Sequence, residues 1–225
     1  MATPPTAADP GGRFISLSIP ADAMVLLIGV AASGKSTFAR RHFGPTEILS
    51  SDALRAIITD DAHAQAATDD AFDLLHRILA VRLRRGRLTV VDATNVEAWA
   101  RAELLAVARR HHRPSVAVVL DLPLEVALAR NLARAEPRPP AAAVRRQHRW
   151  LTDTLPELAS EGYAVVHHLR SAAEIDAVRV ERISSGPAGH NEMSRRNKAV
   201  QPRRPKPPLP SVPDDRSHRT RPRTA

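Results

Sequence analysis

The chain contains no cysteine, and only 3% of its 225 residues are aromatic. The absence of thiols excludes disulfide bonds and zinc sites built from thiolates. No apolar run approaches the roughly 20 residues that a membrane-spanning helix needs, and residues 1–12 lack the basic and apolar regions of a signal peptide. We therefore expect a cytoplasmic protein with no membrane partner.

Apolar residues are plentiful all the same, at 43% of the chain, which is enough for one sizeable core. Apolar segments that suit buried strands, such as residues 24–29 and 115–122, alternate with segments of helical periodicity. This alternation predicts an α/β fold with a parallel sheet that is covered by helices on both faces. We further expect a short edge strand at 13–20 and a last helix over 171–183 that is capped by Ser171.

The net charge of +9 is unevenly distributed. Residues 184–225 contain ten lysines and arginines, three acidic residues and eight of the 19 prolines, so this segment carries +7 and the rest of the chain +2. We expect a flexible leader at 1–12, a folded domain at 13–183 and a disordered basic tail at 184–225. Such a tail is either a solvated extension or a source of non-specific contacts to nucleic-acid phosphates.

One segment carries a specific chemical signature. Residues 29–36 read Gly-Val-Ala-Ala-Ser-Gly-Lys-Ser and directly follow an apolar strand. This pattern is typical of the P-loop, whose backbone N–H groups and helix N-terminus bind phosphates, while its lysine reaches the β- and γ-phosphates and its serine binds Mg²⁺. The sequence therefore predicts a site for ATP, or another nucleoside triphosphate, with Ser36 as a ligand of Mg²⁺. The expected nucleotide-binding residues are Gly29, Ala31, Ala32, Ser33, Gly34, Lys35, Ser36 and Thr37.

The rest of the chain narrows the class of nucleotide-binding protein. A switch GTPase normally carries the guanine-reading pattern Asn-Lys-x-Asp, which is absent here. A motor or large ATPase needs more chain or oligomeric partners, whereas a small domain favours a kinase, with a general base on a second strand and arginines on a mobile lid. The predicted fold is an adenylate-kinase-like P-loop NTPase fold with a helical lid at about residues 130–150.

Two carboxylates follow predicted strands. Asp52 comes after the strand at 46–50, where a carboxylate can accept the proton of an attacking hydroxyl, although Ser51 or Asp52 is equally suited to cap the next helix. Arg55, one turn further, is either a ligand of an acceptor phosphate or a solvated helix residue. Asp92 ends a later strand and is a Walker-B-like candidate that would orient the ligands of Mg²⁺.

The predicted lid is rich in arginine. Six arginines and one acid, Glu136, lie between Arg130 and Arg149. Arg130 and Arg134 are four residues apart, so we expect them to share a helix face and to clamp the transferring phosphate as catalytic residues with Lys35 and Asp52. The alternative is a basic helix that faces solvent.

These motifs together resemble, in order and spacing, the 5′-polynucleotide kinase domain of the bacterial RNA-repair enzyme polynucleotide kinase-phosphatase. The resemblance covers about residues 13–180. It is carried by LLIGVAASGKSTFARRHFGPTEILSSD, ATDDAFDLLH, RLTVVDATN, ARNLAR and EGYAVVHHLRSAAEI.

The resemblance implies transfer of the γ-phosphate of ATP, or another NTP, to the 5′-OH end of RNA or DNA, and of these two partners RNA is favoured. It also implies roles for matching residues: Lys35 and Ser36 for the nucleotide and Mg²⁺, Asp52 as general base, Arg55 on the acceptor phosphate, and Arg130 with Arg134 as lid clamps. The family enzyme continues into phosphatase and ligase-like domains, so we expect separate partner proteins to supply those activities.

Two positions near the predicted base depart from the family pattern, because Ala53 replaces an aromatic residue and Ala56 replaces a glycine. The donor site is thus predicted more firmly than the acceptor. Two other functions fit the sequence. One is a kinase of small molecules such as a sugar, an antibiotic or a nucleoside, and the other is a non-catalytic NTP-binding module that recruits a repair complex.

Overall fold

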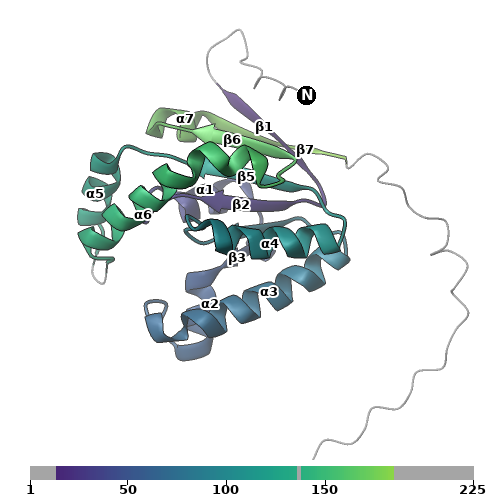
Figure 1. Ribbon diagram of the computed structural model, residues 1–225, viewed down its shortest axis with the longest axis horizontal. Helices are drawn as coiled ribbons and strands as arrows, with labels where there is room; N and C mark the ends of the chain where they lie inside the picture. The colour runs from purple at the N-terminus through teal and green to yellow at the C-terminus, as the bar shows by residue number, and fades with distance from the viewer. Residues whose placement is uncertain (1–13, 136–137, 185–225) are drawn as a thin grey trace, which may run out of the picture. The chain divides into compact units, whose positions relative to one another are not determined.

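The computed structural model describes residues 14–135 and 138–184, so the predicted leader and nearly all of the predicted tail lie outside the described residues. Five parallel strands form the central sheet in the order β3-β4-β2-β5-β6 (Figure 1). From one edge to the other these are Ile48–Ser50, Thr89–Asp92, Met24–Ile28, Ser115–Leu120 and Val165–Leu169. The predicted parallel α/β sheet is confirmed.

The helices connect these strands in chain order (Figure 1). They are α1 (Lys35–His42), α2 (Ser51–Thr59), α3 (Thr68–Arg84), α4 (Ala98–Arg110), α5 (Leu124–Leu132), α6 (Ala141–Thr154) and α7 (Ala172–Ala177). Three short 3-10 helices lie at Pro45–Glu47, Gln65–Ala67 and Leu155–Ser160. Within the described ranges, no helix is both long enough and apolar enough to cross a membrane.

Both faces of the sheet are covered. On one face, Leu26 and Val91 belong to a cluster with apolar side chains of α3, α4 and α6, including Leu79 and Leu104. On the other face, Leu27 belongs to a cluster with side chains of α1, α7, β1 and β7. Because the central strands are buried on both sides, their sequences are continuously apolar rather than alternating.

The predicted last helix is wrong over its second half. Ser171 does cap α7, since its Oγ accepts a hydrogen bond from the Glu174 N–H at 3.1 Å, but the helix ends at Ala177. The remaining residues form β7 (Val178–Ile183), which pairs in parallel with β1 (Ile15–Pro20) in a separate two-stranded sheet. Val178 and Val180 of β7 alternate with the exposed Arg179 and Glu181, so the first four residues of β7 have the period of two that a strand with one buried face requires.

Candidate active site

The P-loop leaves β2 at Gly29, where the backbone passes very close to a neighbouring strand. A Cβ atom on this residue would lie 2.8 Å from the carbonyl oxygen of Leu120 and 2.7 Å from Ser33 Oγ, so only glycine fits. The Gly29 N–H donates to the carbonyl oxygen of Thr94 at 3.0 Å, which ties the loop to the end of β4. Gly34 then precedes α1 with a φ of 102°, in the left-handed region that favours glycine.

Lys35 is buried beneath the loop. Its Nζ donates hydrogen bonds to the carbonyl oxygens of Gly29 at 2.9 Å and Val30 at 2.7 Å. Burial lowers the pKa of Lys35 to about 8, and the nearby carboxylates of Asp92 and Asp52 oppose this change. A buried ammonium that faces two carboxylates suits a site in which phosphate oxygens provide the missing negative charge.

Asp92 lies at the end of β4, beside β2, and is almost fully buried. Burial raises the pKa of Asp92, while a hydrogen bond from the Ser36 hydroxyl and the charge of Lys35 lower it. Hard oxygen ligands such as this carboxylate and hydroxyl are those that Mg²⁺ prefers. The two side chains therefore fit the predicted metal site.

Asp52 lies in the first turn of α2 with 65% of its side chain exposed. It does not cap the helix, and neither does Ser51, because the N-cap is Ser50, whose Oγ accepts from the Ala53 N–H at 3.4 Å. The expectation of a cap at Ser51 or Asp52 is thus wrong by one residue. Since the capping role falls to Ser50, the carboxylate of Asp52 is available for another role.

Arg55 is not a solvated helix residue. Its guanidinium forms an ion pair with Asp52, and its Nε donates to the carbonyl oxygen of Ala62 at 2.9 Å, with only 10% of the side chain exposed. The positive charge of Arg55 is therefore already partly neutralised next to the candidate base.

The two lid arginines take different positions. Arg130 lies on α5 and its Nη1 donates to the carbonyl oxygen of Ser33 in the P-loop at 3.5 Å. Arg134 lies beyond the end of α5 at Leu132, so the expectation that the two share a helix face is wrong. Both arginines nevertheless approach the nucleotide side of the fold, Arg130 through this contact and Arg134 by lining the cleft described next.

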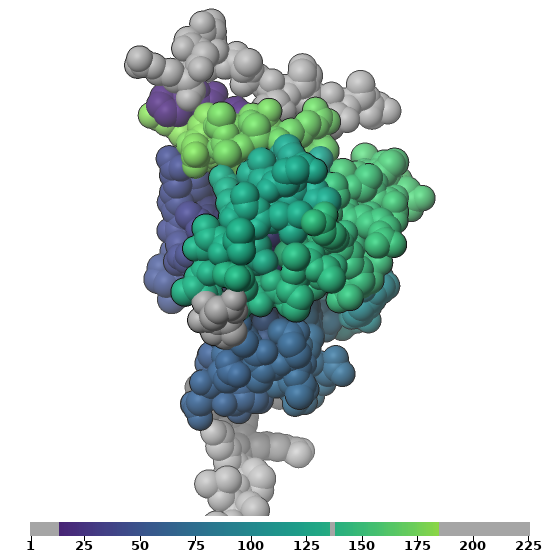
Figure 2. Space-filling model, turned by 90° about the vertical axis from the view of Figure 1, so that its left-hand side faces the viewer, coloured from purple at the N-terminus to yellow at the C-terminus, as the bar shows by residue number. Residues whose placement is uncertain are grey.

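A cleft of about 1030 Å³ brings most of the predicted residues together. Lys35, Asp52, Arg55, Asp92 and Arg134 all line it, as do Ala31, Ala32, Gly34, Ser36 and Thr37. Gly29, Ser33 and Arg130 are not among the lining residues. In Figure 2 the surface of α5 and α6 (teal to green) meets that of α2 and α3 (blue), and the cleft is lined from both sides of this junction.

Two residues with well-defined contacts were not predicted from the sequence: Gln147, which lines the cleft, and Arg101, which does not. Gln147 of α6 accepts a hydrogen bond through Oε1 from the Ala31 N–H of the P-loop at 2.8 Å. Arg101 of α4 is completely buried, pairs with Glu161, and donates from Nη1 to the carbonyl oxygens of Asn95 at 3.0 Å and Val96 at 2.8 Å. Nothing in the local sequence distinguishes these two side chains from their charged neighbours, so only the fold identifies them.

A second set of cleft residues, from α3 and the start of α4, has a different character. We name it the acceptor wall, and it comprises Asp69, Phe72 and Asp73 of α3 together with Glu97, Trp99 and Glu103 at α4. Within the described ranges, no hydrogen bond or ion pair engages the four carboxylates of this wall. The cleft is therefore polarised, with cations at the P-loop and unpaired anions at the acceptor wall.

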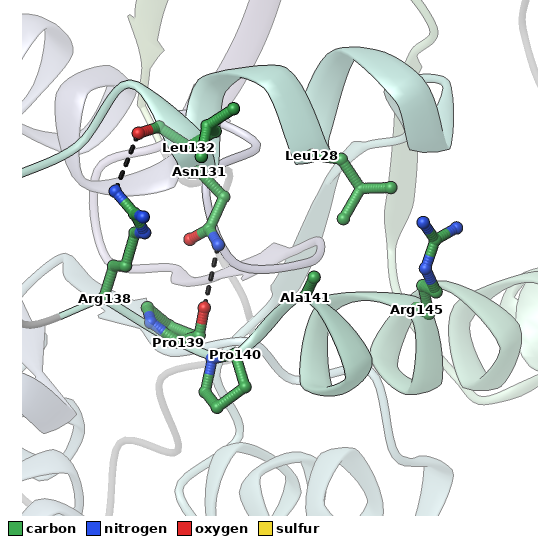
Figure 3. Close-up of a pocket in the computed structure, with 8 residues that line it drawn as sticks. All are labelled: Leu128, Asn131, Leu132, Arg138, Pro139, Pro140, Ala141 and Arg145. Carbon is green, nitrogen blue, oxygen red and sulfur yellow. Dashed lines mark hydrogen bonds between the residues drawn. The ribbon is translucent and has the colours of Figure 1, made fainter.

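A second, smaller pocket of about 380 Å³ lies between the end of α5 and the start of α6 (Figure 3). Leu128 and Ala141 face it from the two helices, and the Asn131 Nδ2 donates to the carbonyl oxygen of Pro139 at 2.8 Å across its edge. The Arg138 Nη1 donates to the carbonyl oxygen of Leu132 at 2.9 Å. These bonds fix the described ends of the connection between α5 and α6.

Residues 24–158 match the model of the AAA domain family. The chain belongs to this family. The matched segment contains the P-loop, both candidate carboxylates and the arginine-rich α5–α6 region, so the family covers the whole candidate site. No functionally curated protein matches the chain.

Solved structures share the fold at low sequence identity. A chain in the structure of the Pnkp1/Rnl/Hen1 RNA repair complex is 23% identical with a TM-score of 0.54, over 63% of this chain and 47% of that one. This chain thus spans about half the length of that relative. A gluconokinase from Sinorhizobium meliloti 1021 (17% identity, TM-score 0.45, 70% and 87% covered) and the Mycobacterium tuberculosis APS kinase CysC (19%, 0.42, 71% and 95%) are also similar. The sheet order, the P-loop and the family match together show the P-loop NTPase fold.

Proposed function

We propose that this protein is an ATP-dependent kinase that phosphorylates the 5′-OH end of a nucleic acid, RNA or DNA. The observation that carries the proposal is the single cleft in which Lys35, Asp92, Arg134 and Asp52 face the same space. The first three surround the expected position of the phosphates, and the last supplies a carboxylate beyond them. This is the arrangement that phosphoryl transfer to a hydroxyl needs.

In the proposed reaction, the carboxylate of Asp52 holds the acceptor hydroxyl and takes its proton as the oxygen attacks the γ-phosphorus. The new oxygen–phosphorus bond forms while the bond from the γ-phosphorus to the bridging β-phosphate oxygen breaks, and the nucleoside diphosphate leaves. Lys35, Arg130 and Arg134 offset the negative charge on the transferring group. Mg²⁺, when bound by Ser36 with Asp92 beside it, would add further neutralisation of the phosphates.

Two observations support a nucleic acid as acceptor. The chain of the RNA repair complex is similar to this one with a TM-score above one half. Arg55 lies beside Asp52 in the cleft, where an arginine can bind the phosphate that follows a terminal nucleoside. Under this proposal residues 13–183 are the catalytic domain, residues 184–225 add non-specific contacts to the strand, and separate proteins carry out any dephosphorylation or sealing.

A small hydroxylated molecule is the second candidate acceptor, and a specific observation favours it. The acceptor wall has four unpaired carboxylates and no cation, which suits an acceptor with amino groups better than a long polyanion. This candidate shares the donor site and the base Asp52 with the first.

A labelling screen separates the two candidates. The full chain is incubated with Mg²⁺ and γ-labelled ATP, and offered 5′-OH oligonucleotides, 5′-phosphate oligonucleotides of the same sequence, sugars and amino sugars. We expect label on 5′-OH ends alone, and none with the matched variant Lys35→Met. Label on a sugar or amino sugar but on no oligonucleotide would overturn the nucleic-acid proposal and leave a small-molecule kinase.

A further inference from the structure

Trp99 is an unusual residue of the cleft, because 63% of this large apolar side chain is exposed. It lies in the first turn of α4 and lines the cleft that holds Asp52. The other tryptophan, Trp150 on α6, is 36% exposed and has the Arg146 guanidinium 5.3 Å from its ring centre, whereas Trp99 has no aromatic or cation–π contact within the described residues. An uncovered indole ring in the same cleft as a candidate base is a free stacking surface.

Phe72 of α3 lines the same wall. Its ring lies edge-on to that of His76, with the ring centres 6.4 Å apart. The helices α3 and α4 run side by side and pack against each other, so two aromatic side chains from different elements face one cleft (Figure 1). Aromatic side chains that line a groove are the usual means by which proteins bind bases of single strands.

The charges of the acceptor wall restrict what can lie against it. Asp69, Asp73, Glu97 and Glu103 are acidic, and Arg55, a cation of the same cleft, is paired with Asp52. Phosphates of a strand would be repelled by these carboxylates. A base is uncharged, and its exocyclic amino groups can donate hydrogen bonds to carboxylates. The exposed aromatic rings and the negative charge of the acceptor wall thus both favour a base over a phosphate as the bound group.

We infer that Trp99, with Phe72 beside it, binds the base of the 5′-terminal nucleotide, and that only this terminal nucleoside lies against the acceptor wall. The inference rests on the proposed nucleic-acid kinase function and specifies how that acceptor is recognised. Trp99 is then a specificity-determining residue that contacts the acceptor and takes no part in binding ATP. The remaining phosphates of the strand leave the cleft on the side away from α3 and α4.

The test combines substitutions of Trp99 with removal of the 5′-terminal base from the acceptor. The full chain, Trp99→Ala, Trp99→Phe and the control Trp150→Ala are assayed with a 5′-OH oligonucleotide and with the same oligonucleotide lacking its 5′-terminal base. Because stacking on an aromatic side chain is worth roughly 1–3 kcal/mol per base, Trp99→Ala should raise the acceptor KM about 5- to 150-fold. The KM for ATP and the melting temperature should not change, and Trp99→Phe and Trp150→Ala should stay near wild type.

The abasic acceptor makes the assignment specific. Wild type should use it about as poorly as Trp99→Ala uses the intact oligonucleotide, and the substitution should cause no further loss with it. Equal losses on both acceptors, or no loss on either, would overturn the stacking role while the kinase function stands. Phosphorylation of no oligonucleotide by any of the proteins would instead overturn the proposed function and this inference with it.

Discussion

The side-chain amide of Gln147, on α6, accepts a hydrogen bond from the Ala31 N–H of the P-loop, 2.8 Å away. Backbone N–H groups of this loop are the donors that bind phosphate oxygens in P-loop proteins. In this structure one of them is bonded to α6, which belongs to the arginine-rich α5–α6 region. When a phosphate binds, its oxygen can replace Gln147 as the acceptor of the Ala31 N–H, and the neutral amide does not repel the phosphate.

This contact predicts a charge-specific effect. Gln147→Glu keeps an oxygen that can accept from Ala31, but its negative charge opposes the phosphates, so ATP affinity should fall about 10- to 100-fold. Gln147→Ala frees the N–H and should leave ATP affinity equal or higher. Calorimetric titration with a non-hydrolysable ATP analogue measures both, with His148→Ala as the neighbouring control. Similar affinities for the Glu and Ala variants would contradict the prediction.

Asp52→Asn tests the proposed base. The swap preserves shape but removes the proton acceptor, so kcat should fall about 10²- to 10⁴-fold while ATP affinity stays near wild type. Because Ser50 caps α2, the matched variant Ser50→Ala should do the opposite, costing about 0.5–2 kcal/mol of stability with little change in kcat. Rapid-quench turnover and thermal melting together distinguish the two, and unchanged turnover in Asp52→Asn means that the base lies elsewhere.

The largely buried ion pair of Arg101 and Glu161 should contribute strongly to the stability of the fold. Removing one partner leaves an uncompensated buried charge, so Glu161→Ala should lower the free energy of unfolding by about 3–5 kcal/mol. Replacing both, as in Arg101→Met with Glu161→Leu, should recover most of this loss, because no charge then remains unpaired. Urea unfolding of wild type, Glu161→Ala and the double variant measures these free energies. A double variant as unstable as Glu161→Ala would show that the unpaired charge of Arg101 is not the cause of the loss.

The ion pair of Glu47 and Arg182 gives a pH-dependent prediction. Hydrogen bonds from Arg182 and, more weakly, from the Gly44 N–H lower the pKa of Glu47 below its usual 4.5, against the effect of burial. The pair therefore stabilises the fold above pH 4.5, and this contribution is lost as the pH falls through the lower folded-state pKa. Glu47→Gln should destabilise by up to about 1 kcal/mol at pH 7, and the difference should shrink towards zero on acidification. A constant difference from pH 7 to pH 3 would contradict this assignment.

The sequence predicted the sheet and the P-loop because both depend on local patterns. A buried parallel strand such as β2 is an unbroken apolar run, and the Gly-Lys-Ser ending of the loop at Gly34 is specific in that position. The strand β7 was missed because its six residues follow a good helix start at Ser171, and only the distant β1 makes them a strand. Arg134 was misplaced because α5 ends early, at Leu132.

The contacts of the site that join distant segments could not be predicted. Gln147 and Ala31 are 116 residues apart, and Arg101 and Glu161 are 60 apart, so no window of sequence contains both members of either pair. Glutamine and arginine on a charged helix are ordinary surface residues by pattern alone. Such pairs follow from the packing of helices on the sheet, which a single sequence does not specify.

The pairing of β1 with β7 has a consequence for how the chain folds. Ile15 lies opposite Val178, and Pro20 opposite Ile183, so one of the earliest described segments pairs with the latest. Leu17 and Ile19 of β1 are fully buried, yet their partner strand is the last of the described elements to be synthesised. During translation β1 therefore remains unpaired, with its apolar side chains exposed, until nearly all of the described domain has left the ribosome. Closing so long a loop is slow, which makes this small sheet the expected final step of folding and the first place where a truncated chain would aggregate.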